Sequence, residues 1–270
     1  MTNKFLSILV FTALLPVLSF AEDPSDAPLG QAISIPDVVT STFTLPDDIH
    51  VNDDQMQTLA NDLPKHGITV LSLAGHGEIG DDSLKVLENQ TQLRELDLQG
   101  TGIHDEGLSH LATLRRLEVL DLSNTQITDD GLVSLEGLKH LRTLHLSNTE
   151  IGDAGLAHLE GLQELRELEL NSTDLTGSGL IHLKGLANLE TLDLGNTKLM
   201  GLCLVPLRSL ENLETLHVNN TSIGNQGIAP LRGLPKLQML DVMCTEVTDE
   251  GLEPFLSHPG LQTMIVCADQ

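Results

Sequence analysis

Carboxylate and imidazole side chains occupy one position of a pattern that repeats every 24 residues along this chain. Side chains of these types attract basic polypeptides, coordinate metal ions, or change charge near neutral pH. Because spacing on adjacent strands does not by itself create a closed coordination shell, we expect no metal ligands and keep cation binding as an alternative function. The position is held by Asp97, Asp121, His145, Glu169, Asp193, His217 and Asp241.

The residues around this position predict the element that carries it. Leu96 and Leu98 flank Asp97 and alternate with polar residues, which is the period-two signature of a short strand with one side facing inward. The same unit continues with Leu108 and Leu111, whose spacing is helical. Each unit is therefore expected to contain a strand, a turn, a short helix and a return segment.

Threonines mark a second position of the same repeat. Strict self-similarity at this period predicts a solenoid, whose units bury their apolar side only by stacking on neighbours. Stacking aligns the strands in parallel and leaves the helices outside. Because helices are wider than strands, we expect the sheet to line a concave wall. The threonines are Thr101, Thr125, Thr149, Thr173, Thr197, Thr221 and Thr245.

Segments such as Leu117–Ile127, with the sequence LEVLDLSNTQI, resemble the leucine-rich repeat family in the 24-residue threonine variant common in exported bacterial proteins. The resemblance extends over residues 51–266. It implies an α/β fold, a right-handed solenoid or horseshoe with a parallel β-sheet on the concave face and short helices on the convex face. It also implies protein recognition on the inner face. Most members carry an asparagine that bonds neighbouring coils where this chain has threonine, and we expect the threonine hydroxyls to do a reduced version of that task.

Two units depart from the pattern where their helix begins. In regular units, Asp105 and its equivalents stand where a carboxylate can accept the first free amides of a helix, so we expect them to be N-caps. Gly177 and Gly201 replace this aspartate. Since glycine also caps a helix tolerably, we expect a local irregularity and not a break.

A secretory signal is predicted at residues 1–21. Lys4 precedes an uncharged apolar stretch that falls short of the ~20 residues needed to span a bilayer. Ser19 and Ala21 are the small residues that a signal peptidase requires. We expect cleavage after Ala21, with an uncleaved membrane anchor as the alternative. The mature protein would then be exported, as a periplasmic, cell-surface or secreted protein without membrane insertion.

The rest of the chain divides into four parts. Residues 22–48 contain four prolines and several acids, and we expect them to form a flexible leader. Residues 49–90 are expected to form an N-terminal cap and an irregular first repeat. Residues 91–258 hold seven regular 24-residue repeats, and residues 259–270 a terminal strand and the C-terminus.

Composition limits the classes of partner. The chain has 14 Lys and Arg residues against 39 Asp and Glu residues, a formal net charge of −25. A polyanion gains nothing by counterion release from a negative surface, so we expect no nucleic acid partner and favour a basic protein. The alternative is that the charge only keeps the protein soluble. Without Trp or Tyr the chain lacks the aromatic anchors of most hot spots, which favours charge-led binding.

The repeated column is the predicted partner-binding surface. Like charges on neighbouring strands destabilise a sheet, so its acids either meet a cationic partner or stay hydrated at a position where aspartate is common. We predict that a polypeptide partner contacts this column together with Glu95 and Glu167 of the column beside it.

The last units of the chain are unusually apolar. Met239, Met243, Ile265 and Cys267 lie there and predict self-association into a homo-oligomer. The alternative is that the final segment folds over its own core as a thin cap.

The cysteine count is odd. Three cysteines, Cys203, Cys244 and Cys267, exclude a fully paired disulfide framework. Cys244 and Cys267 fall on consecutive coils, so a bond between them is conceivable. Cys203 replaces a glycine of other repeats and is expected to be a small buried filler.

No nucleophile with a base and an orienting group, phosphate loop or zinc-ligand spacing appears in the sequence, so we expect neither enzymatic activity nor a cofactor. The favoured function is an exported, non-catalytic module that binds a polypeptide on its acidic concave face. The alternatives are a self-associating structural or surface scaffold and a cation-binding solenoid.

Overall fold

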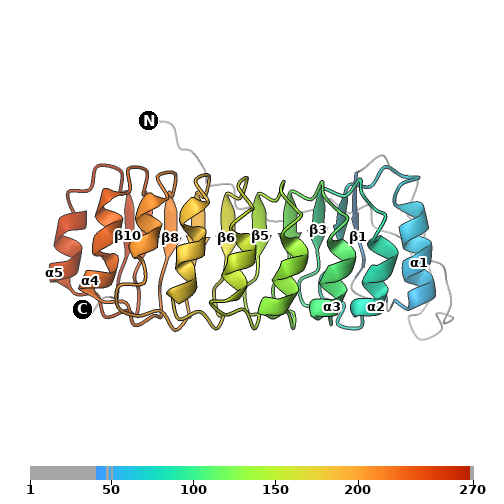
Figure 1. Ribbon diagram of the computed structural model, residues 1–270, viewed down its shortest axis with the longest axis horizontal. Helices are drawn as coiled ribbons and strands as arrows, with labels where there is room; N and C mark the ends of the chain where they lie inside the picture. Colours follow the sequence, from blue (N-terminus) through green and yellow to red (C-terminus); the bar gives the residue numbers. More distant parts are fainter. Residues whose placement is uncertain (1–40, 47–48, 50, 268–270) are drawn as a thin grey trace. The chain divides into compact units, whose positions relative to one another are not determined.

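The structure is a computed structural model that describes residues 41–46, 49 and 51–267 (Figure 1). The predicted signal sequence, residues 22–40 and 47–48 of the predicted leader, and residues 268–270 of the predicted terminal segment lie outside these residues. None of the helices in the described part of the chain has both the length and the apolar character that a membrane span requires.

Short parallel strands form a single sheet whose spatial order follows the sequence. Each strand pairs with the strand of the next unit, and the register places equivalent residues of the repeat side by side, for example Leu96 opposite Leu120. The sheet of the described residues consists of β1 (Thr42–Thr44), β2 (Val70–Ser72), β3 (Glu95–Asp97), β4 (Val119–Asp121), β5 (Thr143–His145), β6 (Glu167–Glu169), β7 (Thr191–Asp193), β8 (Thr215–His217), β9 (Met239–Asp241) and β10 (Thr263–Ile265).

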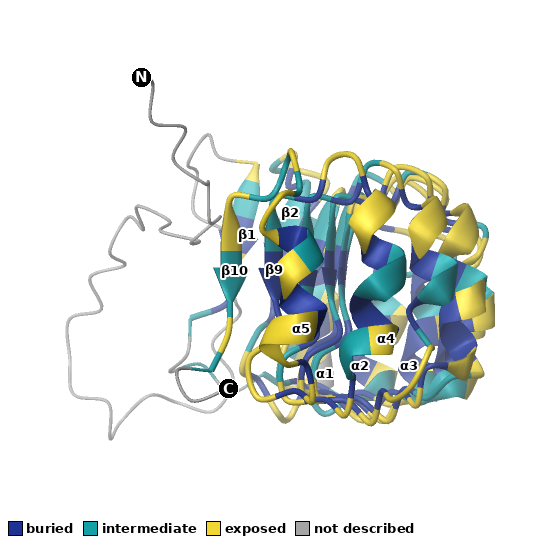
Figure 2. Cartoon of the chain, turned by 90° about the vertical axis from the view of Figure 1, so that its left-hand side faces the viewer, coloured by how far each residue is buried: buried dark blue, intermediate teal, exposed yellow. Residues whose placement is uncertain are grey.

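In the described part of the chain, short helices cover one face of this sheet and no helix lies on the other face (Figures 1 and 2). Many are 3₁₀ helices, which are tighter than α-helices and suit the few residues available in each unit. The α-helices are α1 (Asp53–Asp62), α2 (Asp81–Leu84), α3 (Asp105–Leu108), α4 (Asn225–Ile228) and α5 (Asp249–Leu252). The 3₁₀ helices are η1 (Lys85–Leu87), η2 (Ser109–Leu111), η3 (Asp129–Leu135), η4 (Gly155–Leu159), η5 (Ser178–Gly185), η6 (Val205–Ser209), η7 (Ala229–Gly233) and η8 (Glu253–Phe255).

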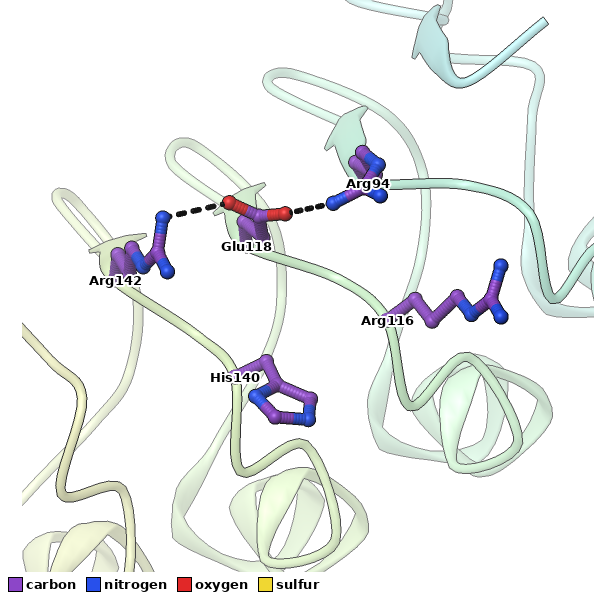
Figure 3. A pocket seen from close by; sticks show the side chains of 5 residues that line it. All are labelled: Arg94, Arg116, Glu118, His140 and Arg142. Carbon is purple, nitrogen blue, oxygen red and sulfur yellow. Dashed lines mark hydrogen bonds and ion pairs between the residues drawn. The ribbon is translucent and has the colours of Figure 1, made fainter.

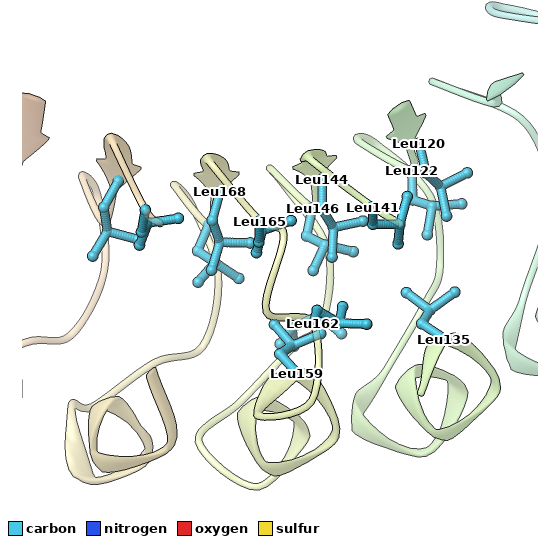
Figure 4. Packing of buried hydrophobic residues seen from close by; sticks show 14 of the residues in the cluster. Leu120, Leu122, Leu135, Leu141, Leu144, Leu146, Leu159, Leu162, Leu165 and Leu168 are labelled. Atoms are coloured by element: carbon cyan, nitrogen blue, oxygen red, sulfur yellow. The ribbon is translucent and has the colours of Figure 1, made fainter. Parts of the chain in front are cut away.

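Leucines fill the space between the sheet and the helices (Figure 4). The middle residue of each strand points inward, and Leu120, Leu144 and Leu168 have no exposed surface. Leu135 and Leu159 meet them from the helix side in the same cluster. Since each strand contributes one inward residue and two outward ones, the chemistry of the open face is decided by the first and third residues of each strand.

The repeated threonines are buried and structural, but they bond within their own coil. Each hydroxyl donates to the carbonyl oxygen three residues earlier, as in Thr101 to Leu98 and Thr125 to Leu122, at 2.6–2.7 Å between oxygens. The expected bond to a neighbouring coil is therefore wrong. A threonine side chain is too short to extend past its own turn, so it closes the turn at the end of the strand instead.

The aspartates that begin the helices are not N-caps. Helix α3 begins at Asp105, its N-cap is His104, and the cap makes no side-chain hydrogen bond. The carboxylate of Asp105 instead accepts from the backbone N–H and the hydroxyl of Thr128 in the next coil, at 2.8 and 2.6 Å. Asp81 and Asp129 accept next-coil amides in the same way, at 2.7 Å each. These carboxylates fasten consecutive coils together.

Gly177 and Gly201 introduce local changes of backbone conformation. Both have a positive φ, 104° and 63°, that non-glycine residues rarely adopt. A Cβ atom on Gly177 would lie 2.4 Å from the Cβ of Cys203, which is half-buried and packs against the core. Strands β7 and β8 remain fully paired across this region, so the irregularity is confined to the helix side.

The N-terminal end is closed by a strand in the segment expected to be a flexible leader. Strand β1 pairs in parallel with β2, and Phe43 and Leu45 are buried against the first coils. The leader prediction is therefore wrong for residues 42–44. Helix α1 follows with a reciprocal capping box between Asn52 and Gln55. Phe43 and Leu45 alternate with threonines, and this short pattern is enough to form β1, although β1 does not belong to a repeat unit.

The C-terminal end is closed less completely. Among the described residues β10 pairs with β9 alone, and the residues of β10 are half-buried or exposed (Figure 2). Phe255 is buried and covers the end of the leucine column, while Leu256 beside it is 76 % exposed.

Candidate binding surface on the sheet

We call the side of the sheet that faces away from the helices the sheet face. It is formed by the first and third residues of the strands, with the middle residues buried beneath. Among these outward positions of β1–β10 there are carboxylates and histidines but no Lys or Arg. The carboxylates are Glu95, Asp97, Asp121, Glu167, Glu169, Asp193 and Asp241.

The structure brings the residues predicted from the sequence into one continuous row. Pairing places Asp97 opposite Asp121, and Asp121 opposite His145. The row continues in the same register through Glu169, Asp193, His217 and Asp241. Glu95 and Glu167 stand at the first position of β3 and β6, beside the row.

The aspartates of this row have a structural task that the sequence analysis missed. One carboxylate oxygen of Asp97, Asp121, Asp193 and Asp241 accepts the backbone N–H two residues further on, at 3.1, 2.8, 2.8 and 2.9 Å. This is the local bond of an Asx turn, and it ends each strand. The repeated aspartate at the end of the strand, followed by a buried Leu or Val, is the signal that could have indicated it.

Burial and neighbouring charges disfavour the ionised form of some of these acids. Burial raises the pKa of Asp97, aided by the charge of Asp121 and opposed by hydrogen bonds from Gln99 and Ser72. Burial and the nearby charge of Glu118 also raise the pKa of Glu95.

His145 is the centre of the densest cluster on the sheet face. Its Nδ1 lies 3.3 Å from Asp121 Oδ2 on the preceding strand. Its Nε2 lies 3.7 Å from Glu167 Oε1 and 3.8 Å from Glu169 Oε1 on the following strand. These two distances exceed those of hydrogen bonds, and Nε2 is a buried side-chain atom without a hydrogen-bond partner.

The carboxylates around His145 favour the charged form of its imidazole. Burial disfavours the charged imidazole, but Asp121, Glu167 and Glu169 outweigh it and raise the pKa of His145 to about 10. His145 in turn lowers the pKa of Glu167 against the effect of burial. The pKa of Glu169 is raised, chiefly by burial and also by the charges of Glu167 and Asp193.

His217 occupies the equivalent position three coils further on but has different neighbours. Its Nδ1 lies 3.5 Å from Asp241 Oδ2 on the following strand. The first residue of that strand is Met239, where the His145 cluster has Glu167. The repeat places both histidines at the same position, and among the described residues the structure forms a carboxylate cluster around His145 and not around His217.

Arginines gather beside the sheet face, just before the strands. Glu118 lies between Arg94 and Arg142 and pairs with both, at 2.9 Å from Nη1 of Arg142 (Figure 3). Together with Arg116 and His140 these residues line a shallow pocket. The basic groups of this edge are thus largely balanced by acids and do not neutralise the sheet face.

The apolar residues predicted for self-association lie on the last two strands and the turns that follow them. Met239 and Ile265 are half-buried at outward positions of β9 and β10, and Met243 is 38 % exposed. Cys244 and Cys267 have free thiols whose sulfur atoms are 3.3 Å apart. The structure places these residues together, next to the free edge of β10.

Comparison with known proteins agrees with this architecture. A family model described as a leucine-rich repeat region matches residues 54–249. The chain belongs to the leucine-rich repeat family. Leucine-rich repeat domains of this kind typically mediate contacts between proteins and are typically non-catalytic. No curated protein sequence is similar enough to be matched.

Two solved leucine-rich repeat structures from Listeria monocytogenes are similar to the chain. Internalin C2 is 28 % identical, with a TM-score of 0.62 over 80 % of this chain and 84 % of internalin C2. The internalin inlF is 24 % identical, with a TM-score of 0.61 over 81 % of this chain and 65 % of inlF, and it supports the fold alone. The resemblance recognised in the repeats is therefore confirmed at the level of family and fold.

Proposed function

We propose that the chain is an exported, non-catalytic module that binds a basic polypeptide on its sheet face. The observation that carries the proposal is the charge of this face, which has seven carboxylates at outward strand positions and no Lys or Arg among those of β1–β10. Export is supported by the signal pattern at residues 1–21, which lies outside the described residues.

The acids of the sheet face differ in how free they are to meet a partner. The row aspartates each commit one oxygen to the backbone. The second oxygen contacts a neighbouring side chain, such as Ser72 at 2.8 Å from Asp97 and Asn171 at 3.1 Å from Asp193, so a partner would share or displace these contacts. Glu95 and Glu167 are half-buried at the edge of the row and make no such backbone bond. A chain laid across the parallel strands would meet a carboxylate on five of the seven strands β3–β9, so lysine and arginine side chains are the complementary groups.

The test neutralises charge without removing the turns. Asparagine retains the acceptor oxygen of aspartate, so a variant with D97N, D193N, D241N and E95Q is expected to fold normally. The mature chain and this variant are used to capture proteins from an extract of the source organism, and the affinity of the recovered partner is then measured at two salt concentrations. We expect the variant to bind at least ~10-fold more weakly, with a reduced dependence on salt.

A matched control removes the same number of charges from the helix side. The substitutions D82N, D130N, E250Q and E253Q fall on exposed residues of α2, η3, α5 and η8. This control should bind as tightly as the unaltered chain. Equal binding by both variants would place the partner elsewhere.

Self-association through the C-terminal end is a second candidate function. The free edge of β10, the exposed Leu256 and Met243, and Val266 at 39 % exposure favour it. Light scattering over a concentration series tests it directly. Growth of the mass with concentration, suppressed by L256K, would support association, and a constant monomer mass at high concentration would exclude it.

A further inference from the structure

We propose that His145, Glu167 and Glu169 form a binding site for a divalent transition-metal ion of the zinc class. The three residues lie on the neighbouring strands β5 and β6 of the sheet face. One ligand atom from each, an imidazole nitrogen and two carboxylate oxygens, lies within 4.8 Å of the others. The proposal is independent of the polypeptide partner discussed above.

The distances within the cluster suit an ion better than direct bonds. The 3.7 and 3.8 Å separations from His145 Nε2 to the two glutamate oxygens are too long for hydrogen bonds. Donors that stand 2.0–2.2 Å from zinc at tetrahedral to trigonal angles are roughly 3.3–3.8 Å apart. The distances from His145 Nε2 to the two glutamate oxygens therefore match the separation expected between two ligands of one central ion.

The nitrogen that would bind the ion makes no hydrogen bond, and its ion pairs at 3.7 and 3.8 Å are to the two glutamates themselves. Nε2 of His145 is buried and has no hydrogen-bond partner, and it is the single such side-chain atom among the described residues. A buried polar atom without a partner is costly, and such atoms mark places where an ion or water belongs. The orphaned atom faces the two glutamates, so the same centre satisfies all three groups.

Neighbouring residues orient the ligands. Asp121 Oδ2 lies 3.3 Å from Nδ1 of His145, so it would keep the proton on Nδ1 when the ion displaces the proton of Nε2. This is the carboxylate–histidine–metal arrangement found around many metal sites. Ser147 donates to Oε2 of Glu169 at 3.3 Å, which leaves Oε1 for the ion, and Asn171 holds Ser147 at 2.8 Å.

The donor set indicates the class of ion. Imidazole with two carboxylates suits zinc and related transition metals, whereas calcium and magnesium prefer all-oxygen sites. Two glutamate charges balance a divalent ion. Three protein ligands leave a coordination position for water or for a side chain of another molecule.

Isothermal titration of the mature chain with zinc chloride tests the site at about pH 8, because protons compete with the ion for Nε2. Adjacent thiols also bind zinc, so the titration is done with C244S and C267S in place. We expect one tight binding event, whose affinity falls at least ~100-fold in H145Q and in E169Q. Calcium chloride under the same conditions should give no comparable event.

The repeat supplies a matched control in His217. H217Q removes an imidazole from the same position of the repeat, next to Asp241 but without a glutamate at the position of Glu167, and it should leave the tight event unchanged. Cobalt(II) absorption in the visible region gives a second readout, whose tetrahedral bands should disappear in H145Q and E169Q but remain in H217Q. Circular dichroism checks that each variant folds.

Three outcomes would overturn the proposal. The first is that the protein with an unaltered cluster shows no tight zinc binding. The second is that H145Q binds zinc as tightly as that protein, and the third is that H217Q loses as much affinity as H145Q. The first would leave the cluster as an ion-paired imidazolium among carboxylates. A failure here would not affect the capture experiment, since that variant keeps His145, Glu167 and Glu169.

Discussion

His145 and His217 stand at the same position of the repeat, yet the regions around them differ. In the region β4–β6, His145 has a carboxylate on the preceding strand and two on the following strand. In the region β8–β10, His217 has one close carboxylate, and methionines, thiols and a free strand edge follow. The repeat decides where a side chain stands, and the next coil decides its chemistry. The following predictions test this difference between the central and the C-terminal region.

A large loss of stability is expected from substitutions in the core of the central region. Leu168 of β6 is fully buried between two coils, so L168A should lower the free energy of unfolding by about 3 kcal/mol. Met264 is the equivalent residue of β10 and is half-buried, so M264A should cost only about 1 kcal/mol. Urea unfolding followed by circular dichroism measures both. Equal losses would show that the C-terminal coil is packed as well as the centre.

Oxidation should strengthen the C-terminal region alone. The sulfur atoms of Cys244 and Cys267, 3.3 Å apart, are close enough for a disulfide after a small movement. Oxidised glutathione would accept the two electrons and two protons released by the thiols and become two reduced glutathione molecules. Because the disulfide would restrict the unfolded chain, it should raise the free energy of unfolding by up to about 3 kcal/mol.

Mass spectrometry of the proteolysed protein reports the linked peptides, and urea unfolding reports the gain. C244S is the control and should show neither. Linkage of either thiol to Cys203 would contradict the pairing that the structure presents.

The hydrogen bonds that join consecutive coils should depend on pH in the central region but not in the C-terminal region. Asp153 accepts backbone N–H groups of Gly177 and Gly179 at 3.0 Å each, while Asn225 accepts that of Thr248 at 2.8 Å. Burial opposes the charge on Asp153, but hydrogen bonds, led by the hydroxyl of Thr176, hold its pKa below the usual value. D153A should cost about 2 kcal/mol near neutral pH, because these bonds are made to a charged group.

The direction of this pH dependence follows from the lowered pKa of Asp153. The stabilisation by Asp153 is complete above the pKa of the unfolded state, about 3.9, and is lost as pH falls through the lower folded value. N225A should cost about 1 kcal/mol at every pH, because asparagine does not titrate. Unfolding measured from pH 7 downward compares the two variants. A cost of D153A that does not shrink in acid would exclude the charged bond.

The smallest effect concerns the turns that both regions share. Asp121 and Asp241 both end their strand with a bond to the backbone. D241A should cost about 1 kcal/mol, and D241N should stay within a few tenths of the unaltered chain, because the amide oxygen can replace the carboxylate. Thermal unfolding resolves this difference. An equal cost for the two substitutions would show that the charge, and not the acceptor, matters at this position.

Much of the fold follows from the sequence because a constant period fixes the register. Once Leu96 is placed inward, the equivalent residue of every later coil is placed inward as well, and Asp97 and its equivalents must stand outward. The continuous row on the sheet face was predicted for this reason. Strand β1 was missed because its three residues lie before the repeats, where no period supports an assignment.

The contacts of the site were harder to predict from the sequence, because they depend on which side chains extend from one coil to the next. Asp105 looks like a helix cap in sequence, but its carboxylate extends to the next coil instead. Asp97 looks like a free surface charge, yet it bonds its own backbone. Whether Nε2 of His145 meets the glutamates depends on three side-chain conformations, and the sequence contains no direct record of these.

The constant register also makes the order of the coils a source of new chemistry. The cluster around His145 exists because a unit that carries histidine is followed by a unit that carries Glu-Leu-Glu. Duplication or loss of one whole unit would preserve the backbone pairing and the leucine column, but it would bring different side chains together. Unequal exchange between repeats of such a gene can therefore create or erase a ligand set in one event, with no amino-acid substitution.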